Sequence, residues 1–218
     1  MSHVRVESTD LDGVLIKTTE IDIMNKEAID DDISSFLRSA VENETKVIGF
    51  DIQFSLLSNK NNGYAVPSNL HCKRANLSFC VGQSCLIIRL TSHFELPFGS
   101  LNSFKSLHNF LSLPEYVFVG VGIKDNLAKL EKQYGIGCRN AVELGPMAAS
   151  LMNMPRLSFC GADELAFVVN QIDLRKHRPL SMDFEWGSTP LSKKLVKLAT
   201  VNVYSYYRIG SKLLGAMY

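Results

Sequence analysis

The chain has 218 residues, of which 46% are hydrophobic and 21% are charged, and its formal net charge is +1. These values are typical of a globular domain with a substantial core, and they exclude an intrinsically disordered chain. The charge is uneven, because residues 1–45 contain 4 Lys or Arg against 11 Asp or Glu, whereas residues 46–218 contain 19 against 11. This asymmetry indicates either a solvated acidic segment or an acidic arm that covers a polyanion-binding body.

Cysteine usage and hydropathy bear on the compartment. The five cysteines include no Cys-x-x-Cys pair, and the five histidines do not fall at zinc-ligand spacings. This pattern predicts buried free thiols in a reducing compartment. The N-terminus lacks the apolar core of a signal peptide, and no apolar run approaches the roughly 20 residues that cross a bilayer. We expect a cytoplasmic or nuclear protein without a membrane partner.

The first elements predicted along the chain are a hairpin, a helix and a strand. Two alternating stretches within residues 1–28 predict an N-terminal hairpin that packs on the rest of the chain. Residues 30–41 predict a helix, and their leading aspartates are expected to cap its N-terminus. Residues 46–57 carry apolar side chains on both faces, which is typical of a strand at the centre of a sheet.

Two further strands, residues 69–82 and 84–90, are predicted to form an antiparallel pair around a tight turn. The second half of the chain is mostly helical, because its apolar residues recur at intervals of three and four. Its predicted helices span residues 100–113, 126–135, 161–172 and 191–214, and strand-like pieces lie at 116–123 and 140–145.

This order of elements predicts the fold class and the domain organisation. Three antiparallel strands come first, and later strands alternate with helices. The pattern favours an α/β fold with a mixed sheet, antiparallel in its first three strands and then parallel, flanked by helices on both faces. We expect residues 29–218 to form one domain.

Four segments of the sequence are similar to motifs of one enzyme family. GFDIQF (49–54) is similar to the first motif, Gly-(Phe/Leu)-Asp-x-Glu-Trp, and FVGVGIKDNLAKLEKQYG (118–135) to the second. EWGSTPLS (185–192) is similar to the Trp-x-x-x-Pro-Leu-Ser lead-in, and LATVNVYSYYRIGSKL (198–213) to the third motif. In this order they resemble the DEDD-type 3′–5′ exonucleases of the ribonuclease H-like fold, most of all the Werner-type exonuclease domain in its small stand-alone plant form. The resemblance covers about residues 30–216.

The resemblance implies a role for each matched position. The family uses four carboxylates to hold two divalent ions that clamp the reacting phosphodiester. The first aspartate corresponds to Asp51, which is kept. The other positions implied by the motifs are Gln53 for the glutamate, Asn126 and Asn202 for the two further aspartates, and Leu198 for the tyrosine that orients water. The neighbouring Asp125 is expected to be a helix N-cap.

One carboxylate in place of four changes the expected chemistry. A single negative charge does not hold two dehydrated Mg²⁺ ions, and neutral amides are ligands only beside carboxylates. We therefore expect a catalytically inactive 3′–5′ exonuclease-like protein that acts as a nucleic-acid-binding or regulatory assembly subunit. No cofactor is expected, the five matched positions form a vestigial site, and metal binding is absent or at most weak at Asp51.

Other functions stay open at this point. One alternative is a weak or metal-rescued exonuclease that uses Mg²⁺ or Mn²⁺ on single-stranded RNA or DNA. A second Asp-x-Glu-Trp segment offers Asp183 or Glu185 as rescuing ligands, but we interpret it as a decoy, because Trp186 already belongs to the lead-in segment. Another alternative is a pure protein-interaction module. On local sequence alone, Asp51 is also compatible with an ordinary strand carboxylate that nearby donors satisfy.

Basic and aromatic residues around the motifs predict a nucleic-acid surface. Lysines would contact phosphates and aromatic rings would stack on bases, although the same lysines also suit ordinary solvated helix faces. The candidate contacts are Phe54, Lys124, Lys129, Trp186, Lys193, Lys194 and Lys197. The resemblance further implies self-association, or a ring-like oligomer shared with active relatives, because small plant members of the family form ring-like homo-oligomers.

Overall fold

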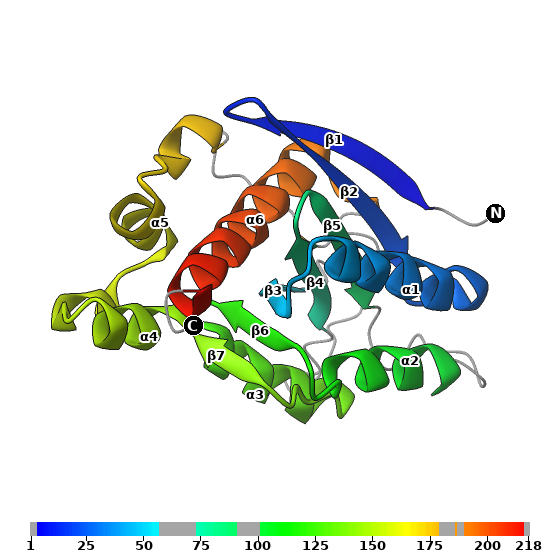
Figure 1. The fold of residues 1–218 in the computed structure, drawn as a ribbon. Coiled ribbons are helices and arrows are strands. Elements are labelled where there is room, and N and C mark those ends of the chain that lie inside the picture. Colours follow the sequence, from blue (N-terminus) through cyan, green and yellow to red (C-terminus); the bar gives the residue numbers. More distant parts are fainter. Residues whose placement is uncertain (1–3, 57–72, 91–100, 179–185, 187–189, 216–218) are drawn as a thin grey trace, which may run out of the picture.

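The computed structural model describes residues 4–56, 73–90, 101–178, 186 and 190–215 (Figure 1). Its strands are β1 (Arg5–Leu11), β2 (Val14–Asp22), β3 (Val47–Leu56), β4 (Lys73–Val81), β5 (Ser84–Leu90), β6 (Val117–Gly120) and β7 (Ala141–Glu143). Its helices are α1 (Lys26–Glu42), α2 (Leu101–Leu111), α3 (Ile123–Tyr134), α4 (Leu144–Leu151), α5 (Ala162–Asn170) and α6 (Lys193–Gly215), with two short 3₁₀ helices, η2 (Pro155–Phe159) and η3 (Leu174–His177).

The strands form one mixed sheet in the order β1-β2-β5-β4-β3-β6-β7. Strands β3, β4 and β5 are antiparallel, whereas β6 joins β3 and β7 joins β6 in parallel. The predicted α/β fold with a mixed sheet is therefore confirmed. The N-terminal hairpin β1–β2 extends this sheet, because β2 pairs in parallel with β5.

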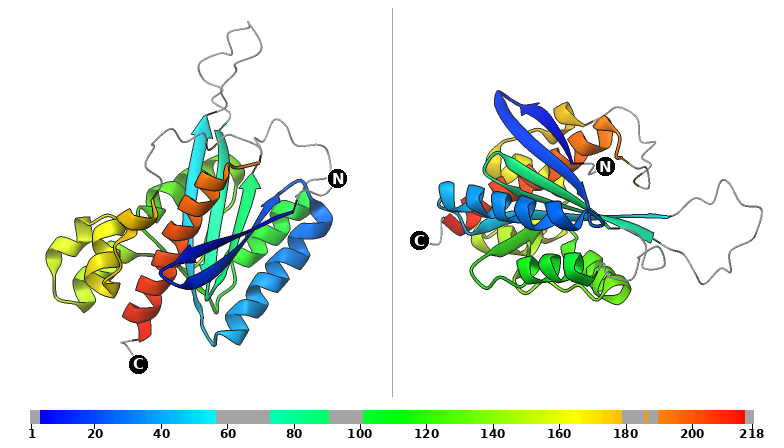
Figure 2. Two further views of the ribbon diagram at one scale, coloured as in Figure 1. Left: turned by 90° about the horizontal axis from the view of Figure 1, so that it is seen from above. Right: turned by 90° about the vertical axis from the view of Figure 1, so that its right-hand side faces the viewer.

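Helices cover both faces of the sheet (Figures 1 and 2). On one face, α1, α2 and α3 enclose a buried aromatic cluster in which the rings of Phe50 and Phe79 stack at 4.6 Å between centroids. On the other face, α6 packs over β3 and β6, and α4 and α5 pack against α6, through a second apolar cluster that includes Val47 and Val201. Strand β3 is buried on both faces, as its continuous apolar sequence predicts.

A close approach sets the position of α6 on β3. A Cβ atom at Gly49 would overlap the Val203 carbonyl oxygen and would lie 2.7 Å from the Tyr207 amide nitrogen. Glycine is the residue that lets helix and strand backbones come this near. The contact brings α6 directly over the strand that carries Asp51 two residues later.

Two predicted helix starts are wrong. Helix α1 begins at Lys26 after Asn25, so the aspartates from residue 30 lie inside the helix instead of capping it. Helix α3 begins at Ile123 with Gly122 as its N-cap, and Asp125 lies in its first turn. Gly122 has a φ of 66°, a left-handed conformation that glycine adopts readily, and it ends the predicted strand early.

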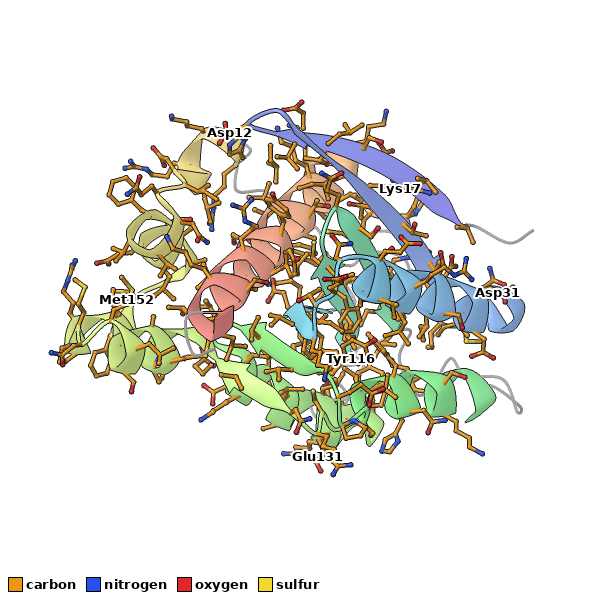
Figure 3. All side chains as sticks on the ribbon, in the orientation of Figure 1. Asp12, Lys17, Asp31, Tyr116, Glu131 and Met152 are labelled. Atoms are coloured by element: carbon orange, nitrogen blue, oxygen red, sulfur yellow. The ribbon has the colours of Figure 1, made fainter. Side chains whose placement is uncertain are left out.

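The acidic N-terminal segment is part of the fold. Figure 3 shows Asp31 on α1, far from Asp12 at the tip of the hairpin, where an Asp12 oxygen lies 3.2 Å from Nε2 of His177. Helix α1 packs against the face of the sheet opposite α6. Its aspartates therefore do not cover the lysines of α6.

The four cysteines in the described ranges are free thiols. Cys80 and Cys85 are buried and face each other across β4 and β5, whereas Cys138 and Cys160 are half-buried. Burial raises the pKa of the Cys138 thiol to about 12. The prediction of buried free thiols therefore holds for two of the four.

Across residues 4–56, 73–90, 101–178 and 190–215, every helix is too short or too polar to cross a bilayer.

Candidate functional site

Strand β3 places Asp51 and Gln53 on the face that α6 covers. Alternate residues of a strand share a face, so the two side chains lie side by side. Asp51 is only 5% exposed. The Nε2 atom of Gln53 donates a hydrogen bond to Oδ2 of Asp51 at 2.9 Å, and the Ile52 amide donates to Oδ1 at 2.9 Å. The position that would carry a second carboxylate therefore acts as a donor to the first.

Helix α6 brings the third motif to the same carboxylate. The Asn202 side chain donates a hydrogen bond to Asp51, and its Oδ1 atom accepts one from Arg178 at 3.5 Å. Leu198 lies one helical turn before Asn202 and is buried. An aliphatic side chain there cannot orient a water molecule.

Helix α3 brings the second motif to β3. The Nδ2 atom of Asn126 donates to the Ile52 carbonyl oxygen at 3.2 Å. At the start of this helix, the backbone amides of Gly122 and Ile123 donate hydrogen bonds to the carboxylate of Glu143 on β7. Asn202 thus meets β3 at Asp51, and Asn126 meets it at the next residue, Ile52. The motif register implies both positions.

Burial and hydrogen bonding act in opposite directions on Asp51. Burial raises the pKa of its carboxyl above the ordinary value, while hydrogen bonds from Gln53, Ile52 and Asn202 and the charge of Arg178 offset part of the rise. Tyr206 is also buried, and burial together with the Asp51 charge raises the pKa of its phenol well above the usual range. The interior of the site is therefore poor in solvent and holds one carboxyl group.

Sequence analysis did not assign three further residues to the surroundings of the motif residues. Tyr206 lies one helical turn after Asn202, a spacing that could have identified it. Asp163 lies in the first turn of α5, and its Oδ1 atom is 2.7 Å from Nη2 of Arg178. Neither Asp163 nor Glu143 stands in a motif, so the sequence contains no signal for them.

The donor atoms do not match two divalent ions. Within the described ranges, no three His, Cys, Asp or Glu side chains are grouped so that they could hold a metal ion. Asp51 supplies one charged ligand, and the amide groups of Asn126 and Asn202 supply neutral oxygens if they turn them toward it. Asp183 and Glu185, the alternative ligands, lie outside the described residues.

The predicted nucleic-acid contacts fall into separate groups. Phe54 packs partly against the aromatic cluster, so it lies on the opposite face of β3 from Asp51 and is not placed to stack a base there. Trp186 packs against the start of α6, and its carbonyl oxygen accepts a hydrogen bond from Nδ2 of Asn76 at 2.9 Å. All five lysines predicted as contacts are exposed: Lys124 and Lys129 on α3, and Lys193, Lys194 and Lys197 on α6.

A buried ionic network holds the entry to α6. Glu20 on β2 is 2% exposed and accepts a hydrogen bond from the Leu191 amide at 2.9 Å. Its Oε1 atom lies 3.1 Å from Nε of Arg89 on β5. Arg5 on β1 donates to the Leu191 carbonyl oxygen at 2.6 Å. The hairpin therefore positions the helix that carries Asn202.

Comparison with known proteins gives one match to a curated sequence. No family model matches the chain. A protein of Arabidopsis thaliana named RISC-interacting clearing 3′–5′ exoribonuclease 1 is 27% identical over 185 residues, which cover 85% of each chain.

Solved structures show the same fold at low identity. The catalytic core of RRP6 from Trypanosoma brucei has a TM-score of 0.58 and 16% identity, over 96% of this chain and 50% of that one. NrnC of Brucella melitensis has a TM-score of 0.55 and 12% identity, over 81% of this chain and 75% of that one. NrnC has also been solved bound to pGG.

These comparisons correct the predicted inactivity. The main prediction was a catalytically inactive subunit, but the relative that matches along 85% of the chain is named as an exoribonuclease. The substitution of motif acids by amides therefore does not establish a loss of function. The alternative prediction of a metal-dependent exonuclease takes its place.

Proposed function

We propose that this chain, which belongs to the DEDD-type 3′–5′ exonuclease family of the ribonuclease H-like fold, hydrolyses single-stranded nucleic acid from its 3′ end. The observation that carries the proposal is the meeting of the three motifs on β3, where Gln53 and Asn202 donate to the Asp51 carboxylate and Asn126 donates to the neighbouring Ile52 carbonyl oxygen. RNA is the favoured substrate class, because the curated relative is named as an exoribonuclease.

We assign the metal dependence to one divalent ion, Mg²⁺ or Mn²⁺. When bound, such an ion polarises a phosphoryl oxygen and lowers the pKa of bound water. Asp51 is the charged ligand, and Gln53 orients it through the hydrogen bond at 2.9 Å. Asn126 and Asn202 would contribute neutral oxygens. Metal affinity and activity are expected to be weak, because the site has one carboxylate instead of four.

The substrate strand is expected to follow the start of α6. Lys193, Lys194 and Lys197 are exposed in the first two turns of this helix, beside Trp186. Ammonium groups along a helix contact phosphates, and an indole ring stacks on a base without regard to sequence. Lys124 and Lys129 on α3 are proposed as more distant contacts with the same strand.

We also propose that the chain self-associates through its N-terminal hairpin, β1–β2. Val6 is 52% exposed and Leu15 is 60% exposed on β1 and β2, and β1 is an edge strand of the sheet. Exposed apolar side chains on a sheet edge favour pairing with another chain. Sedimentation of the chain beside a Val6→Lys, Leu15→Lys variant tests this: a smaller particle for the variant supports it, and an unchanged monomer rejects it.

A nuclease assay tests the proposed activity directly. The purified chain is incubated with 5′-labelled single-stranded RNA or DNA in Mg²⁺, Mn²⁺ or EDTA. We expect stepwise shortening that needs metal, is lost in Asp51→Ala and is kept in Asp125→Ala, whose side chain is exposed on α3. A variant with Gln53→Glu, Asn126→Asp, Asn202→Asp and Leu198→Tyr should be faster. No shortening by the unmodified chain, or equal shortening by Asp51→Ala, would overturn the proposal.

A further inference from the structure

Arg178 places a positive charge beside the motif residues. It follows η3 directly, and its Nη2 atom lies 3.5 Å from Oδ1 of Asn202 and 2.7 Å from Oδ1 of Asp163. Its side chain is 35% exposed. Asn202 in turn donates to Asp51, so the guanidinium and the carboxylate share one amide between them.

The amide at position 202 leaves the charge of this guanidinium available. A carboxylate at position 202, as in the family motif, would pair with Arg178 and neutralise it. Asn202 accepts a hydrogen bond from Arg178 and orients it without adding a negative charge. It also lowers the repulsion that a phosphate would meet at this position.

Among the described residues, Asp163 is the charged partner of Arg178, and this ion pair is easily exchanged. Asp163 and Arg178 have side chains 44% and 35% exposed, and ion pairs in such surroundings contribute little to stability. A phosphate accepts charge-assisted, bidentate hydrogen bonds from a guanidinium group, as a carboxylate does. An incoming phosphate can therefore take the place of the Asp163 carboxylate.

From this geometry we infer that Arg178 binds a phosphate of the substrate strand next to Asp51. The guanidinium then supplies positive charge that other members of the family obtain from a second metal ion. This inference rests on the proposed function for the identity of the strand, a single-stranded polynucleotide. Binding by Arg178 itself requires neither metal nor cleavage.

Binding measured without metal tests the inference separately from catalysis. Fluorescence anisotropy of a labelled single-stranded RNA in EDTA is recorded over a series of salt concentrations. We expect Arg178→Gln to weaken binding about tenfold, because a charge-assisted hydrogen bond is lost. The slope of log affinity against log salt should also become shallower by about 0.7, the value for one phosphate contact on a single strand.

Three further variants separate phosphate binding from a structural role. Arg175→Gln removes a neighbouring charge whose side chain is 77% exposed and pairs with Asp173, and it should change affinity less than twofold. Arg178→Lys keeps the positive charge but loses the bidentate donors of the guanidinium group. Affinity should therefore fall only in part, while the slope of log affinity against log salt is kept. Asn202→Asp should weaken metal-free binding, because the new carboxylate pairs with Arg178 and repels phosphate.

The outcomes distinguish the two proposals. Unchanged affinity and slope in Arg178→Gln, or an equal loss in Arg175→Gln, would reject the phosphate-binding role. A loss of affinity in both Arg178→Gln and Arg178→Lys with no change of slope would show a structural role and also reject it. If the expected differences appear in EDTA but no variant of the chain hydrolyses RNA, the Arg178 inference stands and the proposed exonuclease fails.

Discussion

The Nε2 atom of Gln53 donates a hydrogen bond to Oδ2 of Asp51 at 2.9 Å on the strand at the centre of the sheet. Two carboxylates at these positions would repel each other unless a cation lay between them. The amide turns this repulsion into an attraction, so the site is held together by its own hydrogen bonds. It follows that metal affinity and fold stability change in opposite directions when acids are restored.

The substitution Gln53→Glu tests this opposition. Without metal, the added carboxylate should lower the Tm by a few degrees, which corresponds to about 1 kcal/mol in a domain of this size. Added Mn²⁺ should then raise the Tm of the variant more than that of the unmodified chain. Thermal melts with and without metal give both values. Gln83→Glu, in an exposed turn, is the matched control and should show neither effect.

Removing the charge of Asp51 should stabilise the fold while it abolishes hydrolysis. Burial raises the pKa of this carboxyl in the folded state, so the folded chain holds its proton to higher pH than the unfolded chain. Stability from this group is present at low pH and is lost as pH rises through the folded pKa. Asp51→Asn should therefore raise the Tm by a few degrees at neutral pH.

The pH dependence of the same variant checks the sign of the effect. Below the ordinary aspartate pKa of about 4, both states of the unmodified chain hold the proton, so the difference from Asp51→Asn should shrink. Asp125→Asn, exposed on α3, should track the unmodified chain at every pH. A lower Tm for Asp51→Asn at neutral pH would show that the hydrogen bonds to the carboxylate outweigh its burial.

Gly49→Ala tests the close approach of α6 to β3. Its methyl group would overlap the Val203 carbonyl oxygen and crowd the Tyr207 amide, both of which are backbone atoms. We expect a loss of about 3 kcal/mol of unfolding free energy and a larger loss of nuclease activity, because Asn202 moves with the helix. Gly137→Ala, where nothing lies within 4 Å of the added methyl, should change little in denaturant unfolding.

The buried network at the hairpin makes a further prediction. Among the described residues, Glu20→Gln would leave Arg89 with the Asp22 carboxylate, at 3.4 Å, as its charged partner. Urea unfolding should show a loss of about 2–3 kcal/mol. Glu164→Gln, which removes the exposed ion pair with Arg156, should cost less than about 1 kcal/mol. Equal losses in the two variants would contradict the importance of the buried pair.

The central strand and the order of elements could be predicted from local patterns. The apolar run around Asp51 has both faces buried, and a period of two places Gln53 beside it. The same period would have placed Phe54 on the opposite face, which the prediction overlooked. Helix starts were missed at Asn25 and Gly122 because acidic residues farther along, from Asp30 and at Asp125, were interpreted as the caps, although Asn and Gly are themselves favoured at N-cap positions.

By itself, the sequence determined the sheet, the motif register and the loss of acids at Gln53, Asn126 and Asn202, since these depend on residue type and spacing along one chain. Its prediction of inactivity is contradicted by the comparison with a relative named as an exoribonuclease, because a count of motif carboxylates takes no account of related proteins. Only the tertiary structure decided that Arg178, Asp163 and Glu143 lie near the motif residues. Those contacts join elements far apart in the chain through the packing of β7 against α3 and of α5 against α6, and no local pattern encodes them.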